Sequence, residues 1–335
     1  MAPFTNATLR RAACDYMWDP TEAEEKHGPI ADWDVSRVTD MSRLFARLFG
    51  SAGQGAQTRC IQADLSRWDV ANVTDMSEMF WRQHVLDCNL VTWDTGSVTN
   101  MCGMFGHCYN FNGNIGCWDV SSVTNMSYMF QHAHAFNQDL DLWRVASVTC
   151  MRSMFEQAHA FNGDVKSWCV GNVTHAGFMF HGALAFNGDL RSWIVLGIEN
   201  CTHMFCGARS FNCDLSRWCL MHVTHMSCWL DETPAFDGRL NPSIVNRMHS
   251  LYCRRQPKLL WRIARRLLCP VAKARCIVWF WMELAARPDR NGRPPPAYFD
   301  AFALDFQDEA AHPALVRCAR AHFVSRQNST RAPQG

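Results

Sequence analysis

Four potential metal ligands occur at regular intervals near residue 220. Cys219, His222, His225 and Cys228 are spaced three residues apart, and thiolate and imidazole are the ligand types that zinc prefers. Local zinc motifs, however, combine closely spaced Cys-x-x-Cys pairs, and the chain contains no such pair. The four residues also follow the register of a longer repeat. We therefore predict neither a metal site nor a cofactor.

Other side chains that could bind or react occupy positions at which the copies of this longer repeat differ in residue type. They are Arg144, Cys169, Ile194 and Cys219 in one register, Cys150, His175, Asn200 and His225 in a second, and His132, His134 and His159 near a phenylalanine. The chain has no G-x-S-x-G, P-loop, dinucleotide-binding glycine motif or H-E-x-x-H. The sequence thus predicts a protein that is not an enzyme, with no catalytic residues, and places recognition at the variable positions.

A 25-residue repeat positions all of these side chains. Its anchor tryptophans are Trp33, Trp68, Trp93, Trp118, Trp143, Trp168, Trp193 and Trp218, separated by 35 residues once and then by 25. Valine, methionine, two phenylalanines and a leucine recur in fixed register, as in Val123, Met126, Phe130, Phe136 and Leu140. A period of this length is typical of solenoids, in which stacked coils bury a shared core. We expect the aromatic columns to be core and not a ligand box.

Asparagine and threonine form two polar columns, represented by Asn137 and Thr124. Short amide and hydroxyl groups at corners bond to backbone groups, so we expect ladders along the stack. Within a coil, Val123 to Ala133 has helix-like spacing and Leu140 to Val145 is strand-like. We expect a short parallel strand and a helical turn in every coil. The 17 cysteines do not share a register in neighbouring coils. We predict free thiols, with an offset pair such as Cys201 and Cys228 as the alternative.

The phrase W-D-V-S-x-V-T-x-M-S-x-M-F, followed by F-N-x-D-L, is complete in Trp118 to Phe130 and Phe136 to Leu140. It resembles the BspA-like leucine-rich-repeat family. The resemblance implies an α/β repeat solenoid, a leucine-rich-repeat-like right-handed coil with short parallel strands and helical turns. It also implies protein contacts or adhesion.

The ends of the chain depart from the repeat. We predict an N-terminal helical cap over residues 1–30, with a helix from Thr8 that Asp19-Pro20 interrupts and a second turn capped by Thr21. Residues 31–243 form the solenoid of eight to nine repeats. Residues 50–57 are a surface loop, either a tolerated insertion or a recognition loop. Residues 244–335 form a basic helical C-terminal segment with a disordered tail.

Charge and hydropathy set the expected partners and location. The net charge of +1 does not favour nucleic acid, and no known nucleic-acid-binding motif accompanies the basic residues. We expect a non-enzymatic scaffold that recognises an unidentified protein partner. The alternative is a cell-surface adhesin or a membrane-associated protein that uses basic, amphipathic residues 255–286 on an anionic membrane surface. The sequence shows no signal peptide, which favours an intracellular location, whereas the family resemblance favours the cell surface.

Overall fold

The computed structural model describes residues 2–46, 60–86, 88–237, 240, 241 and 244. Clustering of backbone contacts divides the chain into two units, residues 1–255 and 256–335. All described residues belong to the first unit. The expected loop at 50–57 and, apart from Ile244, the expected basic segment at 244–335 lie outside the described residues.

Two α-helices precede the first coil. Helix α1 (Asn6–Trp18) begins with a capping box between Thr5 and Thr8 and buries one side, formed by Leu9, Ala12, Ala13 and Tyr16. Helix α2 (Pro20–His27) is capped by Asp19, whose side chain accepts the N–H groups of Thr21 and Glu22. The expectation that Thr21 caps the second helix was therefore wrong. A short 3-10 helix, η1 (Ile30–Asp32), leads into the repeat.

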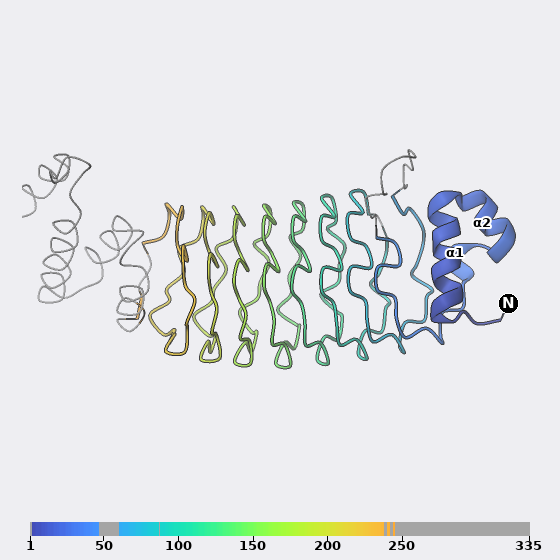
Figure 1. Ribbon diagram of the computed structural model, residues 1–335. Coiled ribbons are helices and arrows are strands. Elements are labelled where there is room, and N and C mark those ends of the chain that lie inside the picture. Colours follow the sequence, from blue (N-terminus) through green and yellow to red (C-terminus); the bar gives the residue numbers. More distant parts are fainter. Residues whose placement is uncertain (1, 47–59, 87, 238–239, 242–243, 245–335) are drawn as a thin grey trace, which may run out of the picture. The chain divides into compact units, whose positions relative to one another are not determined.

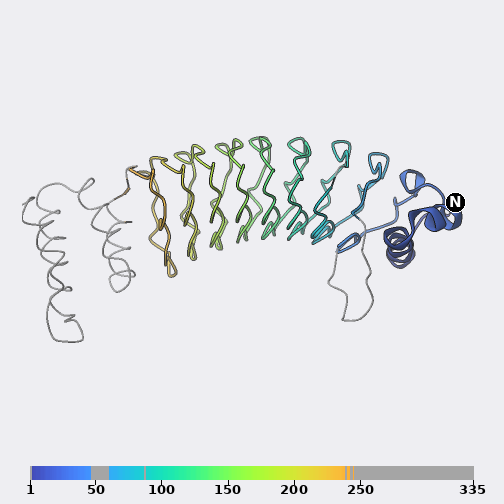
Figure 2. The ribbon, with the colours of Figure 1, turned by 90° about the horizontal axis from the view of Figure 1, so that it is seen from above.

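From Trp33 onward, the chain forms a row of coils that lie side by side, and each coil begins at an anchor tryptophan of the repeat (Figures 1 and 2). Single parallel bridges connect Asp40, Asp75, Asn100, Asn125, Cys150, His175, Asn200 and His225 in turn, and one more connects Leu215 to Leu240. Most bridges thus lie seven residues after the tryptophan, whereas the sequence pattern suggested a strand around the tryptophan itself. In the described ranges, no strand is longer than such a bridge.

The segment expected to form a helical turn forms a succession of tight turns instead. The N–H groups of Met126, Tyr128, Phe130 and His132 donate to the carbonyls of Cys150, Arg152, Met154 and Glu156, respectively, in the next coil, over 2.7–2.9 Å. Residues between them close short turns inside the coil, such as Met129 N–H to Met126 carbonyl. Because alternate amides bond to the next coil, they are not available for helical hydrogen bonds.

The aromatic columns are buried and stacked. Phe130 is fully buried, with ring centroids 5.5 Å from Phe155 in the next coil and 4.0 Å from Phe136 in its own. Each anchor tryptophan is at most 4% exposed. From Trp68 onward, its indole Nε1–H donates to the main-chain carbonyl three residues before the preceding anchor tryptophan, whereas Trp33 donates to Gly28. Trp118 donates to Leu90 at 2.9 Å and Trp143 to Ile115 at 3.1 Å. The prediction that these aromatic columns form the core is confirmed.

The polar columns form the predicted ladders. Asn112 Oδ1 accepts the N–H of Asn137 at 2.9 Å, and Asn137 Oδ1 accepts that of Asn162 at 2.7 Å. Thr124 donates its hydroxyl to the Thr99 carbonyl at 3.2 Å. The same contacts recur along the described coils. These side chains are therefore committed to joining neighbouring coils.

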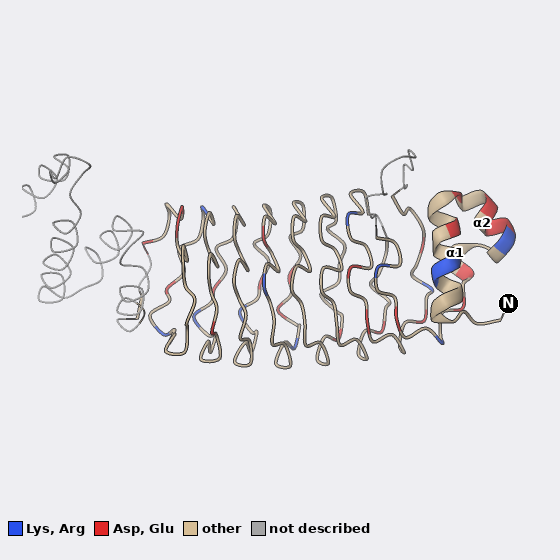
Figure 3. Cartoon of the chain, viewed as in Figure 1, with Lys and Arg blue, Asp and Glu red and all other residues tan. Residues whose placement is uncertain are grey.

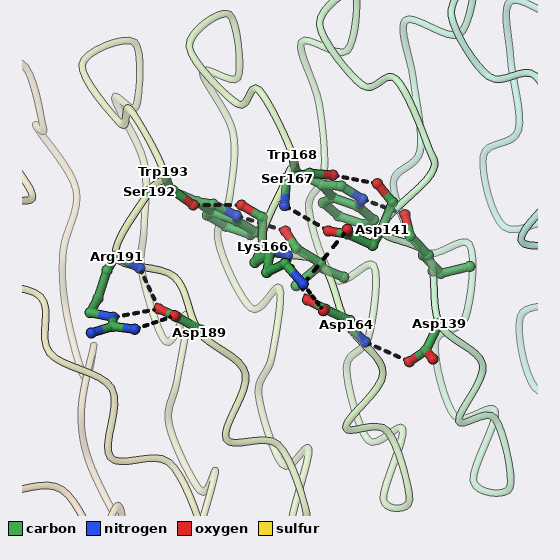
Figure 4. A network of polar contacts seen from close by, with 12 residues as sticks. Asp139, Asp141, Asp164, Lys166, Ser167, Trp168, Asp189, Arg191, Ser192 and Trp193 are labelled. Atoms are coloured by element: carbon green, nitrogen blue, oxygen red, sulfur yellow. Dashed lines mark hydrogen bonds and ion pairs between the residues drawn. The ribbon is translucent and has the colours of Figure 1, made fainter.

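A third row of polar contacts runs along a corner that carries charged residues (Figure 4). Asp164 N–H donates to Asp139 Oδ1 at 2.9 Å, and Lys166 lies between Asp141 and Asp164, 2.7 Å from the Asp164 carboxylate. Arg191 binds Asp189 and lowers the pKa of that carboxyl to about 2 through side-chain hydrogen bonds. Cationic and anionic side chains are interspersed along the coils and are not segregated by sign (Figure 3). Since these groups are exposed, solvent screens the pairs.

The N-terminal helices provide a hydrogen-bond acceptor for backbone N–H groups of the first coil, which has no preceding coil. In later coils, the N–H groups of residues such as Thr74 and Asp75 donate to the carbonyl of Thr39 one coil earlier. For the first coil, Asn6 Oδ1 accepts the N–H groups of Thr39 and Asp40 at 2.9 and 3.3 Å. The Asn6 amide oxygen therefore replaces the missing carbonyl.

The role of Asn6 as acceptor can be tested by measuring the stability of variants. Replacing Asn6 with alanine removes the acceptor of two backbone donors, and we expect the free energy of unfolding to fall by about 1–2 kcal/mol in urea denaturation. Asn6→Asp retains an acceptor oxygen and should lose much less. Equal losses in the two variants would contradict the capping role of the oxygen.

Candidate recognition surface

Two positions of the repeat have a left-handed backbone in each coil in which the structure describes them, and both are variable. The first includes Tyr128 and the second His132. All twelve described non-glycine residues with positive φ belong to these two columns: Arg43, Glu78, Tyr128, Ser153, Phe178, His203 and Cys228 in the first, and Arg82, His107, His132, Gln157 and Glu232 in the second. Bulky residues adopt this conformation rarely, and such strain is concentrated at functional sites. The two columns therefore mark a candidate surface.

Six aromatic and imidazole rings form the centre of this surface, which we call the ring band: His84, His107, Tyr109, His132, His134 and His159. All six are half-buried. In one column, His84, Tyr109, His134 and His159 stack in that order, with successive centroids 4.6, 4.9 and 4.4 Å apart and planes within 12°. The ring band thus spans four coils without interruption.

A second column of the ring band lies beside the first. His107 stacks on His132 at 4.5 Å, and these rings contact Tyr109 and His134 edge to face at 6.2 and 5.9 Å. The two columns therefore fix each other's orientation. Rings held in this way lose little conformational entropy when a partner binds, because their rotamers are already restricted.

Trp81 closes the ring band at its N-terminal side. Its indole contacts His107 edge to face at 4.9 Å and covers the backbone of the next coil at Gly106, where a Cβ atom would lie 2.1 Å from the ring. Glycine at position 106 is what permits this close approach. The tryptophan therefore belongs to the same surface.

More rings extend this surface toward the C-terminal coils. The Arg152 guanidinium lies 5.9 Å from the ring centroids of both Tyr128 and Phe178, a cation–π geometry. Phe178 in turn stacks on His203 at 4.7 Å. Tyr128, Phe178 and His203 occupy the first left-handed column, with Arg152 beside it, and they continue the surface beyond the ring band.

Burial keeps the central imidazoles neutral. Burial, together with the neighbouring His132 and Arg82, lowers the pKa of His107 to about 4. Burial also lowers the pKa of His132 and of His134, with a further contribution from His159. These imidazoles are thus uncharged at neutral pH, where they can both donate and accept hydrogen bonds.

This depression makes folding stability depend on pH. An unfolded histidine binds its proton near pH 6.5, whereas folded His107 binds it only near pH 4. Between these values the unfolded state holds more protons, so the free energy of unfolding should decrease as the pH falls from about 6.5 to about 4. Urea denaturation across this range should show a smaller decrease for His107→Gln than for the parent. Parallel curves for both proteins would refute the assignment.

The sequence-predicted positions are only partly brought together. His132, His134 and His159 lie in the ring band. Cys150, His175, Asn200 and His225 lie in the bridge column instead, where His175 and His225 bond to the hydroxyls of Thr174 and Thr224 at 2.9 and 2.8 Å. Arg144, Cys169 and Ile194 are exposed after their tryptophans, and Cys219 is partly exposed. In the described part of the chain, no three His, Cys, Asp or Glu residues are placed to hold a metal ion.

The described cysteines form no disulfide bond, and this includes the pair Cys201 and Cys228. Many fill space between coils: Cys108 and Cys201 are fully buried, and burial raises the pKa of both thiols. Burial likewise raises the pKa of Cys206 to about 12. Thiols with raised pKa values are weak nucleophiles.

Six residues of this surface were not predicted from the sequence: Trp81, His84, His107, Tyr109, Tyr128 and Phe178. An alignment of the repeat copies would reveal these residues, because rings recur at non-core positions of neighbouring coils. The left-handed backbone at His107, Tyr128 and Phe178 has no such signal, since these are not residue types that favour positive φ.

Comparison with known families now adds one identification. A family model described as "Mycoplasma protein of unknown function, DUF285" matches residues 13–52, 47–158 and 139–243. The chain belongs to this family, and the matched range begins within α1 and continues through α2 and the coils. No curated protein and no solved structure matched the chain. Among the described residues, no helix has the length and apolar character needed to cross a membrane.

Proposed function

We propose that this protein is a non-enzymatic repeat scaffold for protein–protein recognition, with the ring band as its central contact surface. The observation that carries the proposal is the stacking of variable, half-buried rings across consecutive coils, two of which, His107 and His132, have a left-handed backbone. Most other columns contribute to the core or to the ladders between coils. The position after each tryptophan also varies, but its residues Arg144, Cys169, Ile194 and Cys219 form no stack of rings.

The chemistry of the ring band suits a protein partner. Aromatic side chains are enriched at the centres of protein interfaces, where they provide large contact areas at low entropic cost. Neutral imidazole adds hydrogen-bond donors and acceptors that match peptide groups. Because the rings stack over several coils, the surface extends along the stack as an interface requires and is not a single small-molecule pocket.

We further propose that the coils form a BspA-like, leucine-rich-repeat-like solenoid. The support is the repeat phrase together with the bridges, indole bonds and ladders that recur every 25 residues. In such proteins each coil contacts its neighbours and the surface positions vary freely. This architecture explains how recognition residues can change while the core columns stay the same.

Differential capture from the native host tests the proposed function. We expect the full-length His132→Ser/His134→Ser variant to capture at least about ten-fold less of a partner protein that co-purifies with the parent, because the interface centre contributes most of the affinity. The control His175→Ser/His225→Ser replaces two exposed histidines outside the ring band and should retain that protein. Equal capture by both variants, with equal thermal stability, would refute the proposal.

A further inference from the structure

The charges that face the ring band determine which partner it can accept. Glu78, which lies beside Trp81, and Arg82 belong to the coil of His84; Arg152, which lies over Tyr128, and Glu156 belong to the coil of His159, and His181 lies in the next coil. The two carboxylates are already engaged. Arg43 binds Glu78 through two hydrogen bonds of 2.9 Å, and Glu156 is held by Gln131 at 2.9 Å and by His181 at 3.5 Å.

Protonation of the stacked imidazoles would therefore place positive charge where the protein's own carboxylates already have partners. The His107 and His132 rings are 4.5 Å apart, and the His134 and His159 rings are 4.4 Å apart. Like charges at this separation repel each other, and Arg82 faces the same group of rings. A carboxylate supplied from outside would relieve this repulsion and form charge-assisted hydrogen bonds.

We propose that the ring band binds an acidic segment of the partner protein and that its imidazoles take up protons as the complex forms. This inference rests on the proposed recognition function and specifies the chemistry of the partner. Each carboxylate that approaches an imidazole favours its charged form. Proton uptake and binding are therefore linked, and the complex becomes tighter as the pH decreases.

Calorimetric titration of the full-length protein with a synthetic peptide of alternating glutamate and serine tests this inference. Between about pH 7.5 and 5.5 glutamate stays ionised, and we expect at least about ten-fold tighter binding at the lower value. Titrations in buffers of different ionisation enthalpy should show net proton uptake. Lysine and arginine elsewhere in the chain stay protonated over this range, so their contacts with the peptide contribute no uptake.

Matched variants assign the effect to the ring band. His107→Gln/His132→Gln should abolish most of the uptake and the pH dependence, whereas His175→Gln/His225→Gln should keep both. The proposal is overturned if affinity is the same at both pH values, or if a glutamine–serine peptide binds as tightly. Tighter binding of an oligonucleotide of matched charge would overturn it in favour of nucleic acid. If the ring-band variant loses the captured host protein but the acidic peptide does not bind, recognition stands and the acidic partner is refuted.

Discussion

Replacing Phe130 with alanine is expected to lower the free energy of unfolding by about 3–5 kcal/mol. The ring is fully buried and contacts rings on every side: Phe105 and Phe155 in the neighbouring coils at 5.8 and 5.5 Å, and Phe136 at 4.0 Å. Neighbouring coils hold the surrounding side chains in register, so the cavity cannot collapse. The loss therefore includes both transfer and cavity contributions.

Urea denaturation followed by tryptophan fluorescence measures this loss, and Phe178→Ala is a suitable comparison. Phe178 is half-buried and stacks on His203 at the surface, so its replacement leaves no closed cavity. We expect a clearly smaller loss there. Hydrogen exchange in Phe130→Ala should also accelerate most in the coils next to the substitution, because each coil contacts only its neighbours. A loss no larger than that of Phe178→Ala would show that the stacked column is not the core.

Replacing Gly163 with alanine should destabilise the protein by about 1–3 kcal/mol, through crowding and not through a cavity. A Cβ atom at this position would lie 2.1 Å from the Gln138 carbonyl oxygen and 2.8 Å from its carbon. Both atoms belong to the backbone of the preceding coil, which cannot rotate away as a side chain could. The two coils would have to separate locally.

Gly171→Ala is the matched control for this effect. Gly171 is exposed, and a Cβ atom there would meet nothing closer than the Ile194 carbonyl oxygen at 4.0 Å. Since alanine restricts the unfolded chain more than glycine, this change should be neutral or slightly stabilising. If thermal denaturation gives equal shifts for both variants, close approach of the coils is not the cause.

The register of the fold could be predicted from the sequence because stacking imposes one environment on one position. Trp118 and Asn137 occupy sites that recur in each coil, and the same side-chain bonds recur with them. The polar ladders follow from the same logic. In these columns a residue type reports directly on its surroundings.

The local backbone could not be predicted in the same way. Met126, Met129 and Phe130 have helical spacing, yet hydrogen bonds to the next coil impose tight turns with left-handed residues at Tyr128 and His132. Local propensity does not contain this information, because the deciding partners are 24 residues away in the chain. The same reason hid the ring band, whose members become neighbours only when those turns align.

The most direct test of the central claim is site-specific photo-cross-linking in the native host. A photoreactive residue replaces His134 in the ring band or, as control, exposed His222 outside it. The account predicts a discrete adduct with one partner protein from position 134, competed by excess unmodified protein, and none from position 222. An adduct from position 222 with none from position 134 would show that recognition occurs elsewhere on the chain.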